Sequence, residues 1–205
     1  MTPPLDDTVA ALPAPTAAAS SEGPDALVDR AAEAALRLAA DRPWSEITLR
    51  DIAEAAGAPF AALYARAPGK SALLHRYSRR LDAEAMDLAA GDRSAAAHDR
   101  LFEAFMARLE AMQPHRDALI AIGRSEGALV AQALPRTARA LSEAAGVDTS
   151  GWRGGARLAA LTGVWARTLQ VWRDDDGALN RTMAEIDSRL KAANRRLARL
   201  RADWT

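Results

Sequence analysis

Residues 48–74 contain two short amphipathic segments separated by a glycine, and this stretch constrains the fold more than any other. Thr48 fits the N-cap of a first helix that ends near Ala56, and Gly57 can adopt the positive φ that terminates a helix. The second segment begins near Pro59, and its large apolar residues have the spacing of one helical face: Phe60, Leu63 and Tyr64. Two helices joined by such a turn predict a helix-turn-helix, whose second helix enters the major groove of DNA.

The same region is locally basic in a chain whose formal net charge is zero. No Asp or Glu lies between positions 55 and 81, whereas six basic or imidazole side chains do: Arg66, Lys70, His75, Arg76, Arg79 and Arg80. A local electropositive surface of this kind attracts phosphate groups. The overall balance of 27 basic and 27 acidic residues excludes nucleic-acid binding over the whole surface, so we expect any such binding to be local.

The composition indicates an all-α protein. Alanine and leucine, which favour helices, dominate the sequence, and β-branched residues are few. The chain has no cysteine, which excludes disulfides and thiolate zinc sites and fits a cytoplasmic location. No apolar run approaches the roughly 20 residues that a membrane-spanning helix requires.

The order of the segments predicts three parts. Residues 1–24 are rich in Pro, Ala, Thr and Ser, lack the pattern of a secretory signal, and predict a disordered tail. Residues 25–70 predict a three-helix DNA-binding domain, in which Trp44 and Ile47 fill a small core. Residues 71–205 predict a helical bundle for ligand binding and dimerisation. Its helices are expected at residues 70–90, 98–112, 127–145, 156–173 and 179–201, and a further helix is expected to begin at Pro114. Pro135 should kink or break the helix at 127–145, and residues 147–155 are expected to form a loop.

The last predicted helix has a heptad pattern. Its apolar residues alternate four and three positions apart: Leu179, Met183, Ile186, Leu190, Ala193, Leu197 and Leu200. The other faces are basic. This pattern fits a helix within an intramolecular bundle, a homodimer interface built from the last two helices, or a basic helix that lies on an anionic membrane with Trp204 at its end.

Residues 44–57, together with the dipeptide Leu63-Tyr64 and residues 68–74, resemble the N-terminal domain of TetR-type bacterial regulators. The resemblance covers about residues 25–80. It implies a homodimer in which each subunit uses one helix-turn-helix to read a palindromic operator in double-stranded DNA. It also implies a small apolar ligand in the C-terminal domain that changes the spacing of the two helix-turn-helix units, and it implies a regulator rather than an enzyme.

The residues that this resemblance places on DNA depart from the family pattern. Alanine dominates the first turns of the second helix, where the family has a hydroxyl residue followed by polar or basic residues, and Arg66-Ala67 replaces an aromatic pair. An alanine methyl can touch thymine but bonds no base edge. We expect Arg66, with Arg50 or Tyr64, to read bases and Lys70 to bind a phosphate. The predicted DNA-binding set is Thr48, Arg50, Pro59, Phe60, Ala61, Tyr64, Arg66 and Lys70.

This departure leaves an alternative open. Some TetR-fold accessory proteins of ubiquinone biosynthesis have lost DNA binding and bind isoprenoid lipids instead. Residues 165–190 resemble the ends of those proteins faintly, although the longer Gly-Asp and Trp/His-Tyr-Lys-Arg motif does not precede them. A TetR-fold lipid-binding accessory protein is therefore the second hypothesis.

The apolar faces of the central helices predict a ligand pocket, because aromatic residues and methionines form adaptable walls. The predicted lining is Phe102, Phe105, Met106, Leu109, Leu161, Trp165, Leu169 and Trp172. Ordinary core packing explains each of these residues as well. Trp165 and Trp172 are seven residues apart and share a helical face, so one is expected in a core or dimer interface and the other at a cavity.

No catalytic pattern is present in the sequence. The three histidines, His75, His98 and His115, lie far apart without metal-ligand spacing, and no nucleophile elbow or phosphate-binding glycine loop occurs. The acidic run at 174–177 is interpreted as a turn. We therefore expect no catalytic residue, no metal and no cofactor.

Overall fold

The computed structural model describes residues 24–89, 94–175 and 177–204. Within these ranges every regular element is helical, which confirms the all-α prediction. The elements are α1 Pro24–Asp41, η1 Trp44–Glu46, α2 Leu49–Ala55, α3 Phe60–Arg66, α4 Lys70–Leu88, α5 Ala97–Met112, η2 Gln113–His115, α6 Arg116–Ser125, α7 Gly127–Ala144, α8 Gly151–Arg173 and α9 Asn180–Ala198. The predicted tail, apart from Pro24, and residue 90, the predicted end of one helix, lie outside the described residues.

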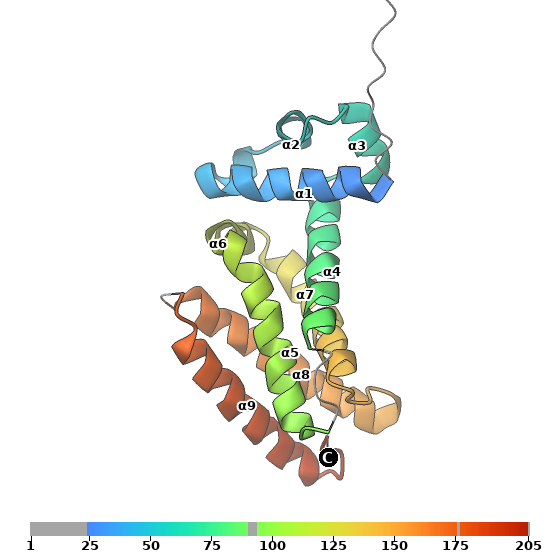
Figure 1. Cartoon of the computed structure of the whole chain (residues 1–205), viewed down its shortest axis with the longest axis vertical. Helices are drawn as coiled ribbons and strands as arrows, with labels where there is room; N and C mark the ends of the chain where they lie inside the picture. Colours follow the sequence, from blue (N-terminus) through green and yellow to red (C-terminus); the bar gives the residue numbers. More distant parts are fainter. Residues whose placement is uncertain (1–23, 90–93, 176, 205) are drawn as a thin grey trace, which may run out of the picture.

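The first three helices form a small unit at one end of the molecule, where α1 lies across the start of α4 (Figure 1). Thr48 caps α2 in a capping box: its Oγ1 accepts a hydrogen bond from the Asp51 backbone, and its own N–H donates to Asp51 Oδ2 over 2.8 Å. Gly57 follows α2 with a φ of 61°, as predicted. Ile47, Ile52 and Leu63 are fully buried beneath the turn. These contacts give α2 and α3 the arrangement of a helix-turn-helix.

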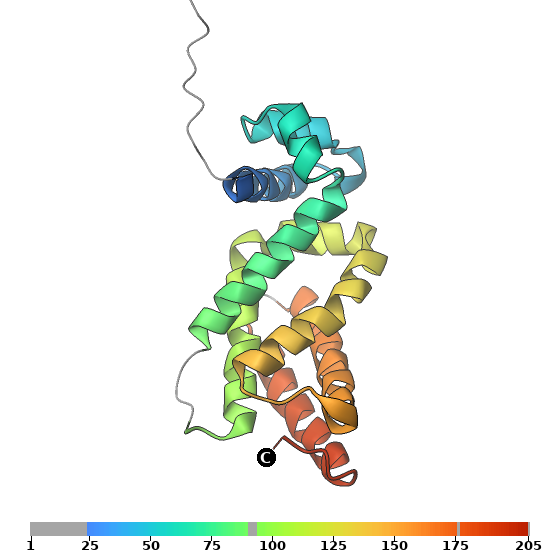
Figure 2. The ribbon, with the colours of Figure 1, turned by 90° about the vertical axis from the view of Figure 1, so that its right-hand side faces the viewer.

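Helix α4 connects this unit to the remaining helices and runs along α5 and α7 (Figures 1 and 2). Helix α8 packs between α7 and α9. One cluster of buried side chains continues from Ala31 in α1 to Trp204 after α9. The helix-turn-helix unit therefore shares its core with the body, so a change in the body can reach it through packed side chains.

Two features predicted in this body differ in the structure. Helix α7 continues through Pro135, so the helix does not break there. Helix α8 begins at Gly151, five residues before its predicted start and within the segment predicted as a loop. Gly154 is required there, because a Cβ atom would lie 2.1 Å from the backbone carbon of Thr149. Gly154 therefore allows a close approach of backbones inside a helix, which local sequence alone does not distinguish from a loop.

The acidic turn before α9 has a structural role. Asp175 is buried, and its Oδ2 accepts hydrogen bonds from the Thr182 backbone N–H at 3.0 Å and the Thr182 hydroxyl at 2.7 Å. This carboxylate binds one of the backbone N–H groups in the first turn of α9 that have no partner within the helix. The turn interpretation is thus confirmed for the described residues of this segment, with a capping role added to it.

Trp204 lies back against the body. Its side chain is buried, and Arg157 donates hydrogen bonds to the carbonyls of Ala202 and Asp203 beside it. In this position Trp204 is not exposed to a membrane surface. Among the described residues, no helix combines the length and apolarity needed to cross a bilayer.

Candidate functional site

The outer face of α3 is exposed, whereas its inner face anchors the helix. Leu63 is fully buried, and Pro59, Ala61, Tyr64 and Arg66 are exposed. The exposed fraction of Tyr64 is 54%, which is high for a large aromatic side chain. Helix α3 therefore presents four of the predicted DNA-binding residues to solvent on a rigid support.

Aromatic stacking joins α2 to this face. The guanidinium carbon of Arg50 lies 4.5 Å above the centre of the Phe60 ring, and the Phe60 and Tyr64 ring centres are 6.0 Å apart. A guanidinium in this position gains a cation–π attraction, and its outer N–H groups stay free to donate. Arg66 donates from Nη1 to the Ala62 carbonyl at 3.1 Å, which holds its side chain along α3.

Lys70 does not have the geometry of a phosphate contact. Its Nζ donates to the carbonyls of Trp44 and Ile47 at 2.6 and 2.7 Å and lies 4.5 Å from the centre of the Trp44 ring. The ammonium group fixes η1 to the start of α4. Thr48 likewise uses its hydroxyl oxygen as an acceptor in the helix cap. Both residues belong to the predicted DNA-binding set, and the structure assigns them positioning roles.

The basic stretch is less electropositive than its sequence suggested, because α1 supplies acids to it. Arg76 makes a bidentate pair with Asp29, with both N–O distances at 2.8 Å, and Arg80 pairs with Glu33. The hydrogen bond from Arg76 holds the pKa of Asp29 below its usual value. These arginines bind α4 to α1, so their charges are largely neutralised.

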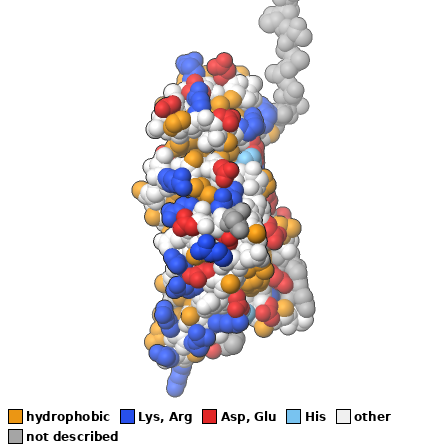
Figure 3. Space-filling view, turned by 90° about the vertical axis from the view of Figure 1, so that its left-hand side faces the viewer, with side chains coloured by type: hydrophobic (Ala, Val, Ile, Leu, Met, Phe, Trp, Pro, Cys, Tyr) orange, Lys and Arg blue, Asp and Glu red, His pale blue; other side chains and the backbone are white. Residues whose placement is uncertain are grey.

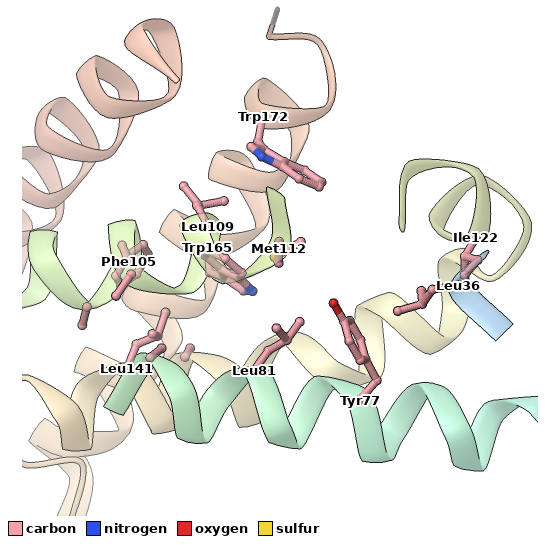
Figure 4. Close-up of a cluster of buried hydrophobic side chains, with 14 of the residues drawn as sticks. Leu36, Tyr77, Leu81, Phe105, Leu109, Met112, Ile122, Leu141, Trp165 and Trp172 are labelled. Atoms are coloured by element: carbon pink, nitrogen blue, oxygen red, sulfur yellow. The ribbon is translucent and has the colours of Figure 1, made fainter. Parts of the chain in front are cut away.

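A cavity of about 360 Å³ lies between α4, the end of α5, α6, α7 and α8. In Figure 4, Trp172 from α8 and Tyr77 from α4 extend toward the same space from opposite sides, with Met112 and Trp165 between them. Most of the remaining wall is apolar, including Leu81, Ile122 and other aliphatic side chains: Leu74, Leu119, Ile120, Leu129, Val130, Leu134 and Leu169.

Three of the eight predicted pocket residues line this cavity: Trp165, Leu169 and Trp172. Both tryptophans line the cavity and both are buried, so the expected division of roles between them was wrong. The other five do not line it. Phe105, Leu109 and Leu161 are completely buried, and Phe102 and Met106 pack against the core at their partly buried positions. Helix α5 uses this apolar face to pack on its neighbours, and only its last turns reach the cavity.

A buried polar group forms one side of the cavity. Arg108 Nε donates to Asp82 Oδ1 at 2.9 Å, and the Thr137 hydroxyl donates to the same oxygen at 3.1 Å. Arg136 donates from Nη2 to the Ser78 hydroxyl at 2.9 Å, and its Nε lies 3.7 Å from Asp82 Oδ2. Arg108 and Asp82 are only 4% and 6% exposed. Burial lowers the pKa of Arg108, and the Asp82 charge opposes that shift.

The sequence carried a signal for this group that the pocket prediction missed. Arg108 lies on the buried stripe of α5 together with Leu101, Phe105 and Met112, where an apolar residue would complete the pattern. A charge on an apolar stripe requires a buried partner. That partner, Asp82, lies beside Leu81 on the buried face of α4, and only the packing of the two helices pairs them.

Glu126 joins the cavity to the helix-turn-helix unit. It precedes α7 and lines the cavity, and its Oε1 accepts a 3.0 Å hydrogen bond from the indole Nε1 of Trp44. Trp44 in turn covers the Lys70 ammonium. The cavity wall is therefore linked by two side-chain contacts to the residue that fixes the start of α4.

A second groove, of about 390 Å³, lies between α8 and α9. Its lining combines small residues with two arginines and one exposed leucine: Ala159, Ala160, Gly163, Val164, Arg189, Ala192, Ala193, Arg196, Leu197 and Leu200. Leu200 and Met183, both members of the predicted heptad seam, are 57% and 39% exposed, so the seam is not fully covered within one chain. Lys and Arg side chains gather toward the C-terminal half of α9 (Figure 3).

The described residues hold no group of three or more His, Cys, Asp or Glu side chains in a metal-binding arrangement. Two of the three histidines contact carboxylates. His98 lies 3.0 Å from Asp187, and His115 lies 2.8 Å from Glu33. His75 lies beside Arg136 at the cavity, with 3.4 Å between Nδ1 and Nη1. The three histidines therefore occupy three separate environments.

The comparisons with known proteins agree with this geometry. Residues 32–77 match the family model described as bacterial regulatory proteins, tetR family. No curated relative matches the sequence significantly. Among solved structures, a TetR transcriptional regulator from Nitrosomonas europaea ATCC 19718 is similar, with a TM-score of 0.66, 20% identity and coverage of 82% of this chain and 97% of that chain.

Two further crystal structures have the same fold. A TetR transcriptional regulator from Rhodococcus sp. RHA1 has a TM-score of 0.59 and 16% identity, over 82% of this chain and 95% of that one. A tetR-family transcriptional regulator from Streptomyces coelicolor has a TM-score of 0.57 and 19% identity, over 87% of this chain and 85% of that one. At these identities the similarity establishes the fold from α1 to α9.

Proposed function

We propose that this chain, whose residues 32–77 carry the helix-turn-helix domain of the tetR family and whose fold is that of TetR-type regulators, is a ligand-responsive transcriptional regulator. It binds palindromic double-stranded DNA as a homodimer. A small, largely apolar ligand in the cavity bounded by α4 and α8 modulates that binding. The observation that carries the proposal is the exposed outer face of α3 on a buried helix-turn-helix core.

Direct readout is assigned to a small group of side chains. Arg50 and Arg66 are exposed and carry guanidinium donors suited to guanine, and the exposed Tyr64 adds a hydroxyl group. Ala61 offers a methyl for thymine contact. Because Arg76 and Arg80 are paired with α1, we expect few phosphate contacts per subunit and a modest dependence on salt.

The dimer is proposed to form through α8 and α9. The groove between them is lined by small side chains that permit close approach, and Met183 and Leu200 beside it expose apolar surface. A second copy related by a two-fold axis would place the same patch on both sides. That arrangement would place two α3 helices on one face of the dimer, as a palindromic site requires.

Coupling between ligand and DNA is proposed to pass through Glu126. A ligand that displaces the Glu126 carboxylate breaks its hydrogen bond with Trp44, which packs on Lys70 at the start of α4. The same ligand would contact α4 directly at Leu74, Tyr77 and Leu81. Both effects would shift the helix-turn-helix unit relative to the body, and a ligand shifts such an equilibrium only by its different affinity for the two states.

The test is selection of binding sites from random DNA by the purified full-length chain, followed by gel mobility shift. We expect a palindromic site whose affinity falls with salt, and weaker binding by the Arg50→Ala and Arg66→Ala variants. Arg79→Ala is the matched control, because Arg79 is exposed on α4 but lies outside α3. Failure to enrich any sequence and to retard genomic DNA at low salt would overturn the proposal.

The alternative function is lipid binding without DNA binding. It is favoured by the alanine-rich surface of α3 and by the neutralised arginines of α4. Under this alternative, organic extraction of the purified protein should release an isoprenoid lipid, and mass spectrometry would identify it. A protein that is free of lipid and protects a palindrome from nuclease would exclude the alternative.

A further inference from the structure

The cavity wall bears hydrogen-bond donors that have no acceptor. Among the described residues, three buried side-chain nitrogen atoms on this wall lack a hydrogen-bond partner: Nη1 of Arg108, Nε of Arg136 and Nε1 of Trp172. All three are N–H groups. Leaving a buried donor without a partner is costly, so a ligand that supplies acceptors would bind here with an advantage over one that does not.

The charges near these donors are unbalanced. In the described part of the chain, Asp82 is the one carboxylate bonded to Arg108 and Thr137, and two guanidinium groups, those of Arg108 and Arg136, face it. The cluster therefore has a net charge of one positive unit. Glu126 does not compensate this charge, because it lies ten residues earlier, about 15 Å along α7, and is bonded to Trp44. Arg173, the last residue of α8, also lines the cavity, and its charge is paired with that of Asp174.

The remaining charged and titratable groups of the cavity wall do not cancel the net positive charge of this cluster. His75 contacts Arg136 through Nδ1, and Tyr77 is neutral over the physiological range because burial raises its pKa to about 12. One negative charge on a ligand would neutralise the cluster. A dianion such as a phosphate monoester would leave a negative excess beside Asp82, which disfavours it.

We propose that the cavity binds a monocarboxylate with a compact apolar body, its carboxylate bonded to Arg108 and Arg136 and its body against the aliphatic and indole side chains. A guanidinium binds a carboxylate through two parallel hydrogen bonds, and burial strengthens such a contact. The volume of about 360 Å³ lies near the lower end of ligand pockets, which favours a small acid. This inference rests on the proposed function, since it specifies the ligand of that regulator.

Isothermal titration calorimetry on the full-length protein tests the assignment. The probes are decanoate and naphthalene carboxylate, each compared with its alcohol, which keeps the apolar body and removes the charge. We expect at least one acid to bind at least about tenfold more tightly than its alcohol, which corresponds to about 1.4 kcal/mol. Failure of both acids to bind, or equal affinities for acid and alcohol, would overturn the proposal.

The variants separate the arginines from general apolar binding. Arg136→Gln should weaken the binding of the acid about tenfold and leave that of the alcohol unchanged. Arg139→Gln is the control on the same helix, because Arg139 donates to Thr149 instead of lining the cavity. Arg136 is about one-third exposed, so its replacement should preserve the fold, which a thermal melt would verify. Unchanged acid affinity in a folded Arg136→Gln protein would overturn the assignment.

A DNA mobility shift with the same probes distinguishes this inference from the proposed function. Binding of the acid by a protein that binds no DNA would overturn the regulator and support the carboxylate site. Release of DNA by the alcohols but not by the acids would support the regulator and overturn the carboxylate site.

Discussion

The indole Nε1 of Trp44 donates a 3.0 Å hydrogen bond to Oε1 of Glu126, across 82 positions of sequence. The bond connects η1, beside the helix-turn-helix, with the residue that precedes α7 on the cavity wall. Lys70 completes the arrangement, because its ammonium group contacts the Trp44 ring and carbonyl together. The site proposed for DNA and the site proposed for ligand thus share a short chain of polar contacts.

Trp44→Phe should reduce the response to ligand while leaving DNA binding intact. Phenylalanine keeps a ring beside Lys70 but removes the donor, and loss of a hydrogen bond to a charged group costs about 1.5–3 kcal/mol of stability. We expect chemical denaturation to show a loss in this range, and DNA release to require more ligand. Glu126→Gln, which retains an acceptor oxygen, is the conservative comparison. An unaltered ligand response in both variants would contradict this coupling.

Lys70→Met should destabilise the domain without changing the salt dependence of DNA binding. Two carbonyls lose their donor, at a cost of about 1–3 kcal/mol each if water does not replace it. Removing a true phosphate contact would instead reduce the slope of log affinity against log salt by about 0.9. Thermal melts and binding at three salt concentrations distinguish the two roles, and a reduced slope with an unchanged melting temperature would show a phosphate contact.

Asp82→Asn should destabilise the fold by about 3–5 kcal/mol, because it leaves the buried Arg108 without its counter-charge. Arg108→Met should cost less, because Arg136 and Thr137 still face Asp82. The double variant should cost less than the sum of the two single changes. Urea denaturation of the four proteins measures this coupling. Additive losses would mean that the two side chains act independently, contrary to their 2.9 Å contact.

The Tyr64→Phe protein retains Tyr77 as its one tyrosine and should ionise with a pKa of about 12, against an ordinary value of 10.0. Burial is the main cause, and the negative Glu33 adds to it. Because the folded pKa is raised, the neutral phenol contributes stability that is complete below pH 10 and is lost as the pH rises toward 12. Tyrosinate absorbance, followed with circular dichroism, measures it. Ionisation near pH 10 in folded protein would contradict the burial.

Gly163→Arg should convert the proposed dimer into a stable monomer. Apart from its own stretch of helix, no atom of the described residues lies within 4 Å of a Cβ built at Gly163, so one chain tolerates the side chain. Loss of a helical glycine also favours α8 by about 1 kcal/mol. Gly155→Arg is the control, since Gly155 is equally open but lies outside the groove between α8 and α9. Light scattering after size exclusion gives the mass, and a Gly163→Arg dimer would place the interface elsewhere.

Most of the fold could be predicted from local patterns. Thr48, Gly57 and Pro59 mark the boundaries of the first two short helices, and the structure places them where capping and turn chemistry require. The apolar periodicity of α5 and α9 identified their buried faces. These predictions succeed because a helix and its ends depend on residues within one or two turns.

The candidate sites were predicted less completely. The residues of α3 could be named from the resemblance to TetR-type regulators, whereas helical spacing alone placed Tyr64 on the same face as Leu63, and the structure exposes the first and buries the second. The pocket prediction selected large apolar residues, and Phe105, Leu109 and Leu161 proved to be core. Size and apolarity do not distinguish a residue that fills a core from one that lines a cavity. That distinction depends on which helix lies opposite, and hence on packing geometry.

The sequence by itself determined the helices and the helix-turn-helix, because local spacing and capping specify them. Only the tertiary structure decided how the charges are used. Lys70, Arg76 and Arg80 form one basic run in sequence, yet in the fold the first binds carbonyls and the other two bind acids of α1. Arg108 and Asp82 likewise form a pair only because α4 packs on α5. Electrostatic energy depends on distance in space, and folding sets that distance between residues far apart in the chain.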